Sequence, residues 1–239
     1  MRSSIRHIKA IFIKEINDYY KNPFTLIVLS ASLIVFFIIF LIHRFKHGSS
    51  SLSYFNIALA LDYNISFSCT LFPPFYIVEE KEKRTLDSLI LSGISSLESL
   101  LGKNLPTVLI TMLTSTCMLL LAKVNFRYLP SLCILIFIVI ISEVILMSLI
   151  GIISKNSIQS LMYSLPFVLI LLLAPMLSLM KTFNNINNLI NVSIMNFMIK
   201  NILNGKGLLY SGYSLLIVFI WLIIPSLLFI LIYKTKKLY

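Results

Sequence analysis

Two carboxylates, Asp62 and Glu143, lie within apolar runs that are long enough to cross a membrane. A charged side chain near the centre of a bilayer costs about 2.5–3.5 kcal/mol on insertion scales, so such residues usually face a cavity or a partner side chain. At about 1.5 Å of helix rise per residue, both fall in the outer half of the membrane and could line one cavity. Two interpretations follow: contact with a cationic or amphipathic molecule in a translocation path, or hydrogen bonds between helices with the carboxyl protonated.

A dense group of charges opens the stretch 79–103, which separates two apolar runs. Its first six residues are all charged, and an acid precedes a base by four residues twice, at Glu79 and Lys83 and at Glu80 and Arg84. Pairs in this order stabilise a helix by about 0.2–0.5 kcal/mol each. Leucine and isoleucine then recur at helical spacing, with polar residues on the other side. The pattern predicts two short amphipathic helices at a membrane surface, with a solvated loop as the alternative.

Motifs for nucleotide or metal chemistry are missing from the sequence. The Gly102-Lys103 and Gly205-Lys206 pairs lack the upstream glycine and the following serine or threonine of a P-loop. The three histidines show no metal-ligand spacing, GxSxG is absent, and the three cysteines lie singly in apolar runs. We therefore expect this chain to be no enzyme and to hold no cofactor or metal, so that any energy from ATP would come from a partner.

The composition is that of an integral membrane protein. Of the 239 residues, 58% are hydrophobic and 12% are charged, and the mean hydropathy is +0.94. This excess of apolar residues is well above that of soluble domains. The net charge of +11 comes from bases scattered between apolar runs, without a dense basic patch or interleaved aromatic residues. We therefore expect membrane lipid, and no nucleic acid, around these bases.

Six apolar runs are long enough to cross a hydrocarbon core of about 30 Å. They lie at 24–42, 52–78, 104–122, 131–153, 161–180 and 214–233. Before them, charged and apolar residues at helical spacing predict an interfacial helix over 3–21, which Asn22 and Pro23 end. The asparagine-rich connection 181–213 forms either short helices or a surface loop. The predicted fold is all-α and polytopic, with six transmembrane helices, an N-terminal interfacial helix and a cytoplasmic helix within 79–103.

The distribution of Lys and Arg predicts the orientation of these runs. With the N-terminus inside, 13 of the 20 Lys and Arg residues fall in cytoplasmic segments and seven in outer segments. Cytoplasmic loops of membrane proteins carry an excess of Lys and Arg. We therefore expect a multi-pass protein of the cell membrane with both termini in the cytoplasm. The stretch 79–103 then lies in the cytoplasm as well.

This stretch resembles the signature of the type-2 ABC transporter permease family. In that family a Glu-basic-Glu-x-Gly-Thr-Leu-Glu run is followed by paired leucines, a proline and a Gly-Lys pair that leads into the next span. The matching positions are Glu80, Lys81, Glu82, Thr85, Leu86, Asp87, Leu89, Ile90, Gly102 and Lys103. Two positions depart from the pattern, since Arg84 stands where glycine is usual and Gly93 where proline is usual.

The resemblance implies that the chain, as one permease domain over 1–239, is the membrane subunit of a bacterial ABC exporter. The residues that it assigns to coupling with a cytoplasmic ATPase subunit, which holds ATP and Mg²⁺, are Glu80, Lys81, Glu82, Thr85, Leu86, Asp87, Leu89 and Ile90. A second permease subunit, identical or related, is expected because six helices enclose little volume. The cargo would be a hydrophobic or amphipathic peptide, toxin, drug or lipid-like compound. A non-transporting immunity or scaffold protein is the alternative.

The orientation can be tested with a cysteine at position 95. We predict that Ser95→Cys, in a background whose native cysteines are replaced by serine, is not labelled by a membrane-impermeant thiol reagent added to intact cells. The reason is that the distribution of Lys and Arg places this residue in the cytoplasm. The same reagent should label it once the cells are opened. Labelling from outside intact cells would contradict the predicted topology.

Overall fold

A computed structural model of the chain describes residues 2–47, 52–83, 96–177, 190–207, 210 and 212–236. All regular secondary structure within these ranges is helical, which confirms the predicted all-α class for them. The eight helices of the described part are α1 (Arg2–Lys21), α2 (Pro23–His47), α3 (Tyr54–Glu82), α5 (Ser96–Leu121), α6 (Leu129–Ile153), α7 (Ser157–Leu177), α9 (Asn191–Leu203) and α10 (Gly212–Lys236).

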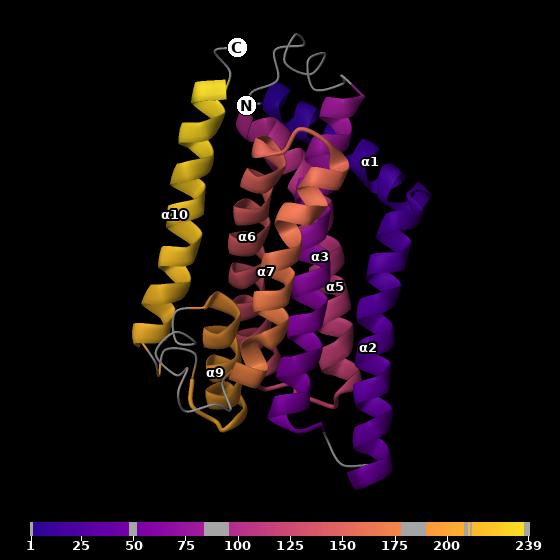
Figure 1. Ribbon diagram of the computed structural model, residues 1–239. Coiled ribbons are helices and arrows are strands. Elements are labelled where there is room, and N and C mark those ends of the chain that lie inside the picture. Colours follow the sequence, from indigo (N-terminus) through magenta and orange to yellow (C-terminus); the bar gives the residue numbers. More distant parts are fainter. Residues whose placement is uncertain are drawn as a thin grey trace.

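Helix α3 is the central element of the bundle (Figure 1). It packs against α2, α5, α6, α7 and α9. Most of its residues are buried, including the polar residues Asp62, Asn64 and Ser66. Its apolar residues Leu61 and Ile65 belong to a hydrophobic cluster that also contains residues of α5, α6, α9 and α10. The polar positions of α3 are therefore covered by neighbouring helices.

Four helices of the described part are long and apolar enough to cross a membrane. They are Pro23–Lys46, Leu101–Leu121, Leu129–Ile153 and Gly212–Leu231. Each coincides with one of the six predicted spans. Many of their outward side chains are large and apolar; Ile27 is 65% exposed and Leu216 is 63% exposed. Contiguous apolar surface of this kind suits a hydrocarbon environment.

Helices α3 and α7 occupy the other two predicted spans, 52–78 and 161–180, without showing the same signal. The hydropathy of α3 is lowered by its buried polar residues and by the charges of its last turn. In α7 the apolar part within the described residues is Ser157–Leu173, which is shorter than the other four. Length and composition therefore support four spans of the predicted six.

The N-terminal segment is helical, as predicted, and its position in a membrane interface stays a prediction. Helix α1 ends at Lys21, Asn22 lies between the helices, and α2 begins at Pro23. The backbone N–H of Phe24 donates a hydrogen bond to Asn22 Oδ1 at 3.0 Å. This bond satisfies one of the backbone donors that a helix start leaves without an intrahelical partner, so Asn22 caps α2.

Two glycines set how closely helices pack near the end of the bundle that carries the charged residues. A Cβ atom added at Gly102 would lie 2.8 Å from both Cβ and Cγ2 of Ile11, so this glycine allows α1 to lie close to α5. A Cβ atom at Gly151 would lie 2.9 Å from Pro74 Cα, so this second glycine does the same between α6 and α3. Any larger residue at either position requires the helices to move.

The stretch 79–103 differs from the prediction of two separate short helices. Residues 79–82 form the last turn of α3, and α5 begins already at Ser96 and continues into the predicted third span. Gly102 lies inside α5, where it packs against Ile11 of α1. Residues 84–95 lie outside the described residues.

The two ends of the bundle carry different elements (Figure 1). One end holds the start of α1, the last turn of α3, the start of α5 and the C-terminal end of α10, while α9 lies at the opposite end. Helix α9 belongs to the asparagine-rich connection 181–213 and buries most of its residues. Residues 191–203 of that connection are therefore helical and are part of the bundle.

The close approach of α1 and α5 can be tested at Gly102. We predict that Gly102→Val lowers the free energy of unfolding by about 1–3 kcal/mol, the usual cost of overpacking, because its side chain would overlap Ile11. Thermal unfolding in detergent would measure the change. Gly207→Val is the matched control, since a Cβ atom there meets nothing within 4 Å. Equal stability of the two variants would contradict a close helix contact at Gly102.

Candidate functional site

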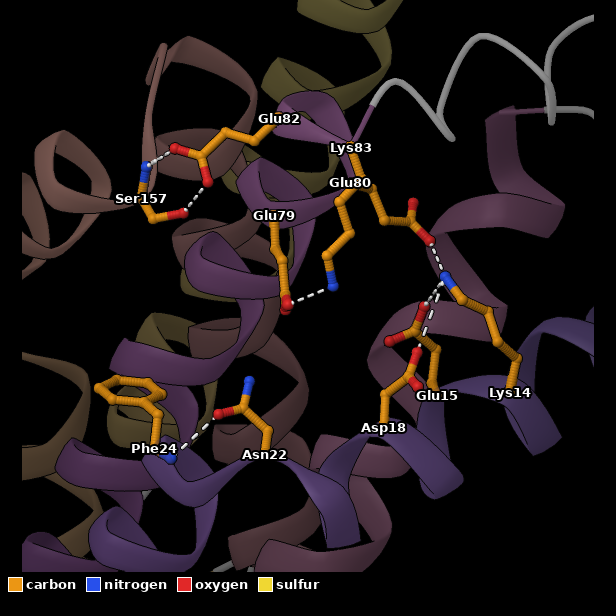
Figure 2. Close-up of polar contacts among 10 residues, drawn as sticks. All are labelled: Lys14, Glu15, Asp18, Asn22, Phe24, Glu79, Glu80, Glu82, Lys83 and Ser157. Carbon is orange, nitrogen blue, oxygen red and sulfur yellow. Dashed lines mark hydrogen bonds and ion pairs between the residues drawn. The ribbon is translucent and has the colours of Figure 1, made fainter.

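The carboxylate of Glu80 connects three helices at the charged end of the bundle. Glu80 lies in the last turns of α3 and is only 5% exposed. It forms ion pairs with Lys14 of α1 and with Lys103 of α5 (Figure 2 shows the Lys14 contact). Burial by itself raises the pKa of Glu80, but the two ammonium groups outweigh it and lower the pKa below its usual value. Glu80 is therefore a buried anion held between two cations.

Glu15 of α1 lies beside this group and behaves differently. Its carboxyl is buried, and Lys14 Nζ lies 3.4 Å from it. Burial raises the pKa of Glu15 to about 7, since the attraction of Lys14 is offset by the nearby negative charge of Glu80. Lys14 Nζ also lies 3.9 Å from Asp18, so this one ammonium group forms ion pairs with the carboxyl groups of Glu15, Asp18 and Glu80 (Figure 2). Burial therefore keeps the pKa of Glu15 above that of an exposed glutamate.

Lys81 binds the end of α6. Its Nζ donates hydrogen bonds to the backbone oxygens of Gly151 at 2.7 Å, Ile152 at 2.6 Å and Ser154 at 3.1 Å. The last carbonyls of a helix have no intrahelical donor and carry partial negative charge, so a cation there is favourable. Lys81 thus caps α6 from a neighbouring helix.

Glu82 binds the start of α7. One carboxylate oxygen accepts from the backbone N–H of Ser157 at 2.7 Å, and the other accepts from the Ser157 hydroxyl at 2.6 Å (Figure 2). These bonds lower the pKa of Glu82. An anion at a helix N-terminus is favourable for the same electrostatic reason that favours a cation at the other end. Lys81 and Glu82 therefore hold both sides of the turn between α6 and α7.

Of the two predicted i,i+4 charge pairs, one is confirmed: Glu79 and Lys83 form an ion pair at 2.6 Å. The other, Glu80 with Arg84, stays a prediction because Arg84 lies outside the described residues. Glu80 also binds Lys14 and Lys103, which the sequence did not indicate as partners. Spacing along one helix reveals pairs within it, whereas partners on α1 and α5 have no signal of that kind.

Three of the eight residues assigned to coupling are described. Glu80, Lys81 and Glu82 are brought together at one helix end, but each binds different helices. The other five lie outside the described residues: Thr85, Leu86, Asp87, Leu89 and Ile90. Their role in coupling stays a prediction.

The two acids within the apolar runs are both bound to helix α9. Asp62 Oδ2 accepts a hydrogen bond from Asn196 Nδ2 at 2.6 Å, and Glu143 Oε1 accepts one from Asn191 Nδ2 at 3.2 Å. Asp62 is 0% exposed and Glu143 is 2% exposed. The interhelical hydrogen bonds considered from the sequence are thus present, and contact with a transported molecule stays a prediction. The sequence did not single out these two asparagines, although the asparagine-rich segment was visible.

The fold and the apolar helices define a membrane-embedded helical protein. Comparison with protein-family models, with curated proteins and with solved structures finds no match to this chain. No group of three or more His, Cys, Asp or Glu side chains within the described ranges could hold a metal ion. The contacts that the described residues make at this site are ion pairs and helix caps.

The ion-paired site can be tested by removing one charge at a time. We predict that Glu80→Gln lowers the free energy of unfolding in detergent by about 3 kcal/mol, because it leaves Lys103 buried without its anion. Glu79→Gln should change it by about 0–1 kcal/mol, because the Glu79–Lys83 pair lies at the surface. If the two substitutions have the same effect, Glu80 does not hold the helices together.

Proposed function

We propose that the chain is the membrane-spanning permease subunit of an ABC exporter. It forms the translocation path for a hydrophobic or amphipathic cargo, such as a peptide, toxin, drug or lipid-like compound, and a separate ATPase subunit drives it. One observation carries the proposal. Three consecutive charged residues of the signature-like run, Glu80, Lys81 and Glu82, connect the end of α3 to α1 and α5, to α6 and to α7.

This arrangement suits the transmission of force from a motor. A partner that pushes on the segment between α3 and α5 would displace the end of α3, which is the central helix. The contacts of Glu80, Lys81 and Glu82 would carry that displacement to four other helices at once. Packed helices move as rigid bodies rather than deforming continuously. A small movement at one end can therefore rearrange the whole bundle.

The proposed topology has six crossings. At about 1.5 Å per residue, the 29 residues of α3 and the 21 of α7 are long enough to join the four apolar helices as spans. The polar residues of α3 are covered by neighbours, so they need not meet lipid. Six crossings bring the end of α10 back to the side of α1, in agreement with Figure 1. The distribution of Lys and Arg favours the cytoplasm for this side, and hence for both termini.

The partners follow from what the chain lacks. Its sequence has no nucleotide-binding motif, so ATP and Mg²⁺ belong to a cytoplasmic ATPase subunit. The exposed apolar sides of α2 and α10 would face lipid or a second permease subunit, identical or related. Two permeases and two ATPases would complete the exporter. The proposed cellular location of the protein is the cell membrane.

A non-transporting immunity or scaffold protein is the second candidate. The observation that favours it is the internal pairing of Asp62 and Glu143, whose bonds to α9 stay within the chain. A scaffold would have no need of an ATPase. Binding of an ATPase therefore distinguishes the two candidates.

The proposal can be tested at the apolar edge of the signature-like run. We predict that Leu86→Ala combined with Leu89→Ala releases the ATPase or uncouples its activity from transport, because each buried leucine contributes about 1.5–3 kcal/mol to docking. The measurements are co-purification of a P-loop ATPase in mild detergent and transport in membrane vesicles.

The matched control is Lys83→Ala. Among the described residues Lys83 pairs with its helix neighbour Glu79 in an exposed position, so its removal should change docking little. If the double leucine variant keeps both the ATPase and transport at the level of the unchanged protein, this stretch does not couple the chain to a motor.

A further inference from the structure

Helix α9 meets the bundle through two buried pairs of an asparagine and an acid. Asn196 donates to Asp62 of α3, and Asn191 donates to Glu143 of α6. The two asparagines lie five positions apart on a helix of 13 residues. The pairs therefore fasten a short helix at two points to two different helices.

At the first pair, two buried oxygen atoms lack a hydrogen-bond donor among the described residues. Asn196 Nδ2 donates to Asp62 Oδ2, whereas Asp62 Oδ1 and Asn196 Oδ1 are both buried and have no hydrogen-bond partner among the described residues. If Asp62 is ionised, both atoms are acceptors and neither can satisfy the other. A single proton on Asp62 Oδ1 makes it a donor to Asn196 Oδ1. The acid and the amide then form a closed ring of two hydrogen bonds.

The second pair has the same deficit. Asn191 Nδ2 donates to Ser142 Oγ at 2.6 Å and to Glu143 Oε1 at 3.2 Å, but Asn191 Oδ1 is buried and has no partner within the part of the chain that the structure describes. A proton on Glu143 would supply the missing donor. Each pair lacks one hydrogen-bond donor, and protonation of its own acid would provide one.

The charges around the pairs do not stabilise carboxylates. Among the described residues, no ion pair joins Asp62 or Glu143 to a lysine, arginine or histidine. Described titratable groups near α9 have other contacts or are exposed: Lys200 over the ring of Tyr54, Lys206 over the ring of Tyr210, His43 against Asn56, and Tyr213 at the exposed start of α10. The Cys69 thiol of α3, which lies near Glu143, contacts Thr111 Oγ1. A buried carboxylate without a cation is strongly unfavourable, and the neutral acid removes that cost.

We propose that Asp62 and Glu143 are proton-binding sites that fasten α9. Each neutral carboxylic acid completes a hydrogen-bonded pair with an asparagine of α9, and loss of the protons releases the helix from α3 and α6. This inference is independent of the proposed transport function, because it concerns contacts within the chain alone.

The state of the acids can be measured directly by infrared spectroscopy of the purified protein in lipid nanodiscs. At neutral pH we expect the C=O stretching band of protonated carboxylic acid, with part of its intensity missing in Asp62→Asn and more of it missing when Glu143→Gln is added. Identical band intensity in the unchanged protein and the double variant would overturn the proposal.

The docking of α9 can be measured with a cysteine at Met195, which is fully buried on this helix. The reporter is Met195→Cys in a chain with Cys117→Ser and Cys133→Ser. Its labelling rate is divided by that of Gly207→Cys, an exposed position, in a second chain with the same two serine substitutions, to correct for thiolate formation. We expect the corrected rate to rise with alkaline pH. Asp62→Asn with Glu143→Gln should abolish this rise and keep the rate low, since amides can form the same paired bonds without a proton.

Asp62→Ala is the contrasting variant. It removes the pair altogether and should raise the corrected rate at neutral pH by about tenfold, which corresponds to a loss of about 1.4 kcal/mol. If Asp62→Asn raises the rate as much as Asp62→Ala does, the site requires a carboxylate and the proposal is wrong. A corrected rate that does not change up to the pH at which the protein unfolds would also overturn it.

Discussion

The burial of charge at one end of the bundle constrains how the other helices can lie. A carboxylate removed from water needs cations close by, and Glu80 obtains them from Lys14 and Lys103 on two other helices. Helix α1 must therefore lie against α5 and the end of α3, and Gly102 allows this approach. The position of the N-terminal helix is thus set by electrostatics as well as by its apolar side.

Helix α3 shows how polar residues are kept inside an apolar bundle. Asn64 donates to Thr114 Oγ1 at 2.9 Å and to Ser115 Oγ at 2.8 Å, both on α5. Asn104 of α5 in turn donates to Ser148 of α6 at 2.9 Å. Apolar side chains pack against any apolar neighbour, whereas such bonds require a particular partner. The polar residues therefore specify which helices are adjacent, and the surrounding apolar residues suit the contact with lipid.

The sequence predicted what depends on neighbours along the chain. The all-α class, the helix that ends before Asn22 and the Glu79–Lys83 pair all follow from local spacing, and the structure has them. The hydropathy of α3 is lower than that of the four apolar helices, because its polar residues lower the average even where other helices cover them. Lys14 is 66 residues from Glu80, and Asn196 is 134 residues from Asp62. Periodicity gives the side of a helix on which a residue lies, but not the helix that packs against it.

The contacts of Lys81 and Glu82 have a consequence for biogenesis. Their partners lie 70 or more residues later in the chain, so they have not yet been made when α3 leaves the ribosome. Neither contact can form until α6 and α7 have been synthesised and packed side by side. Only a hairpin in the correct register presents the carbonyl oxygens of α6 and the first N–H of α7 at the same time. Closure of this contact thus marks the point at which the second half of the chain is correctly assembled on the first.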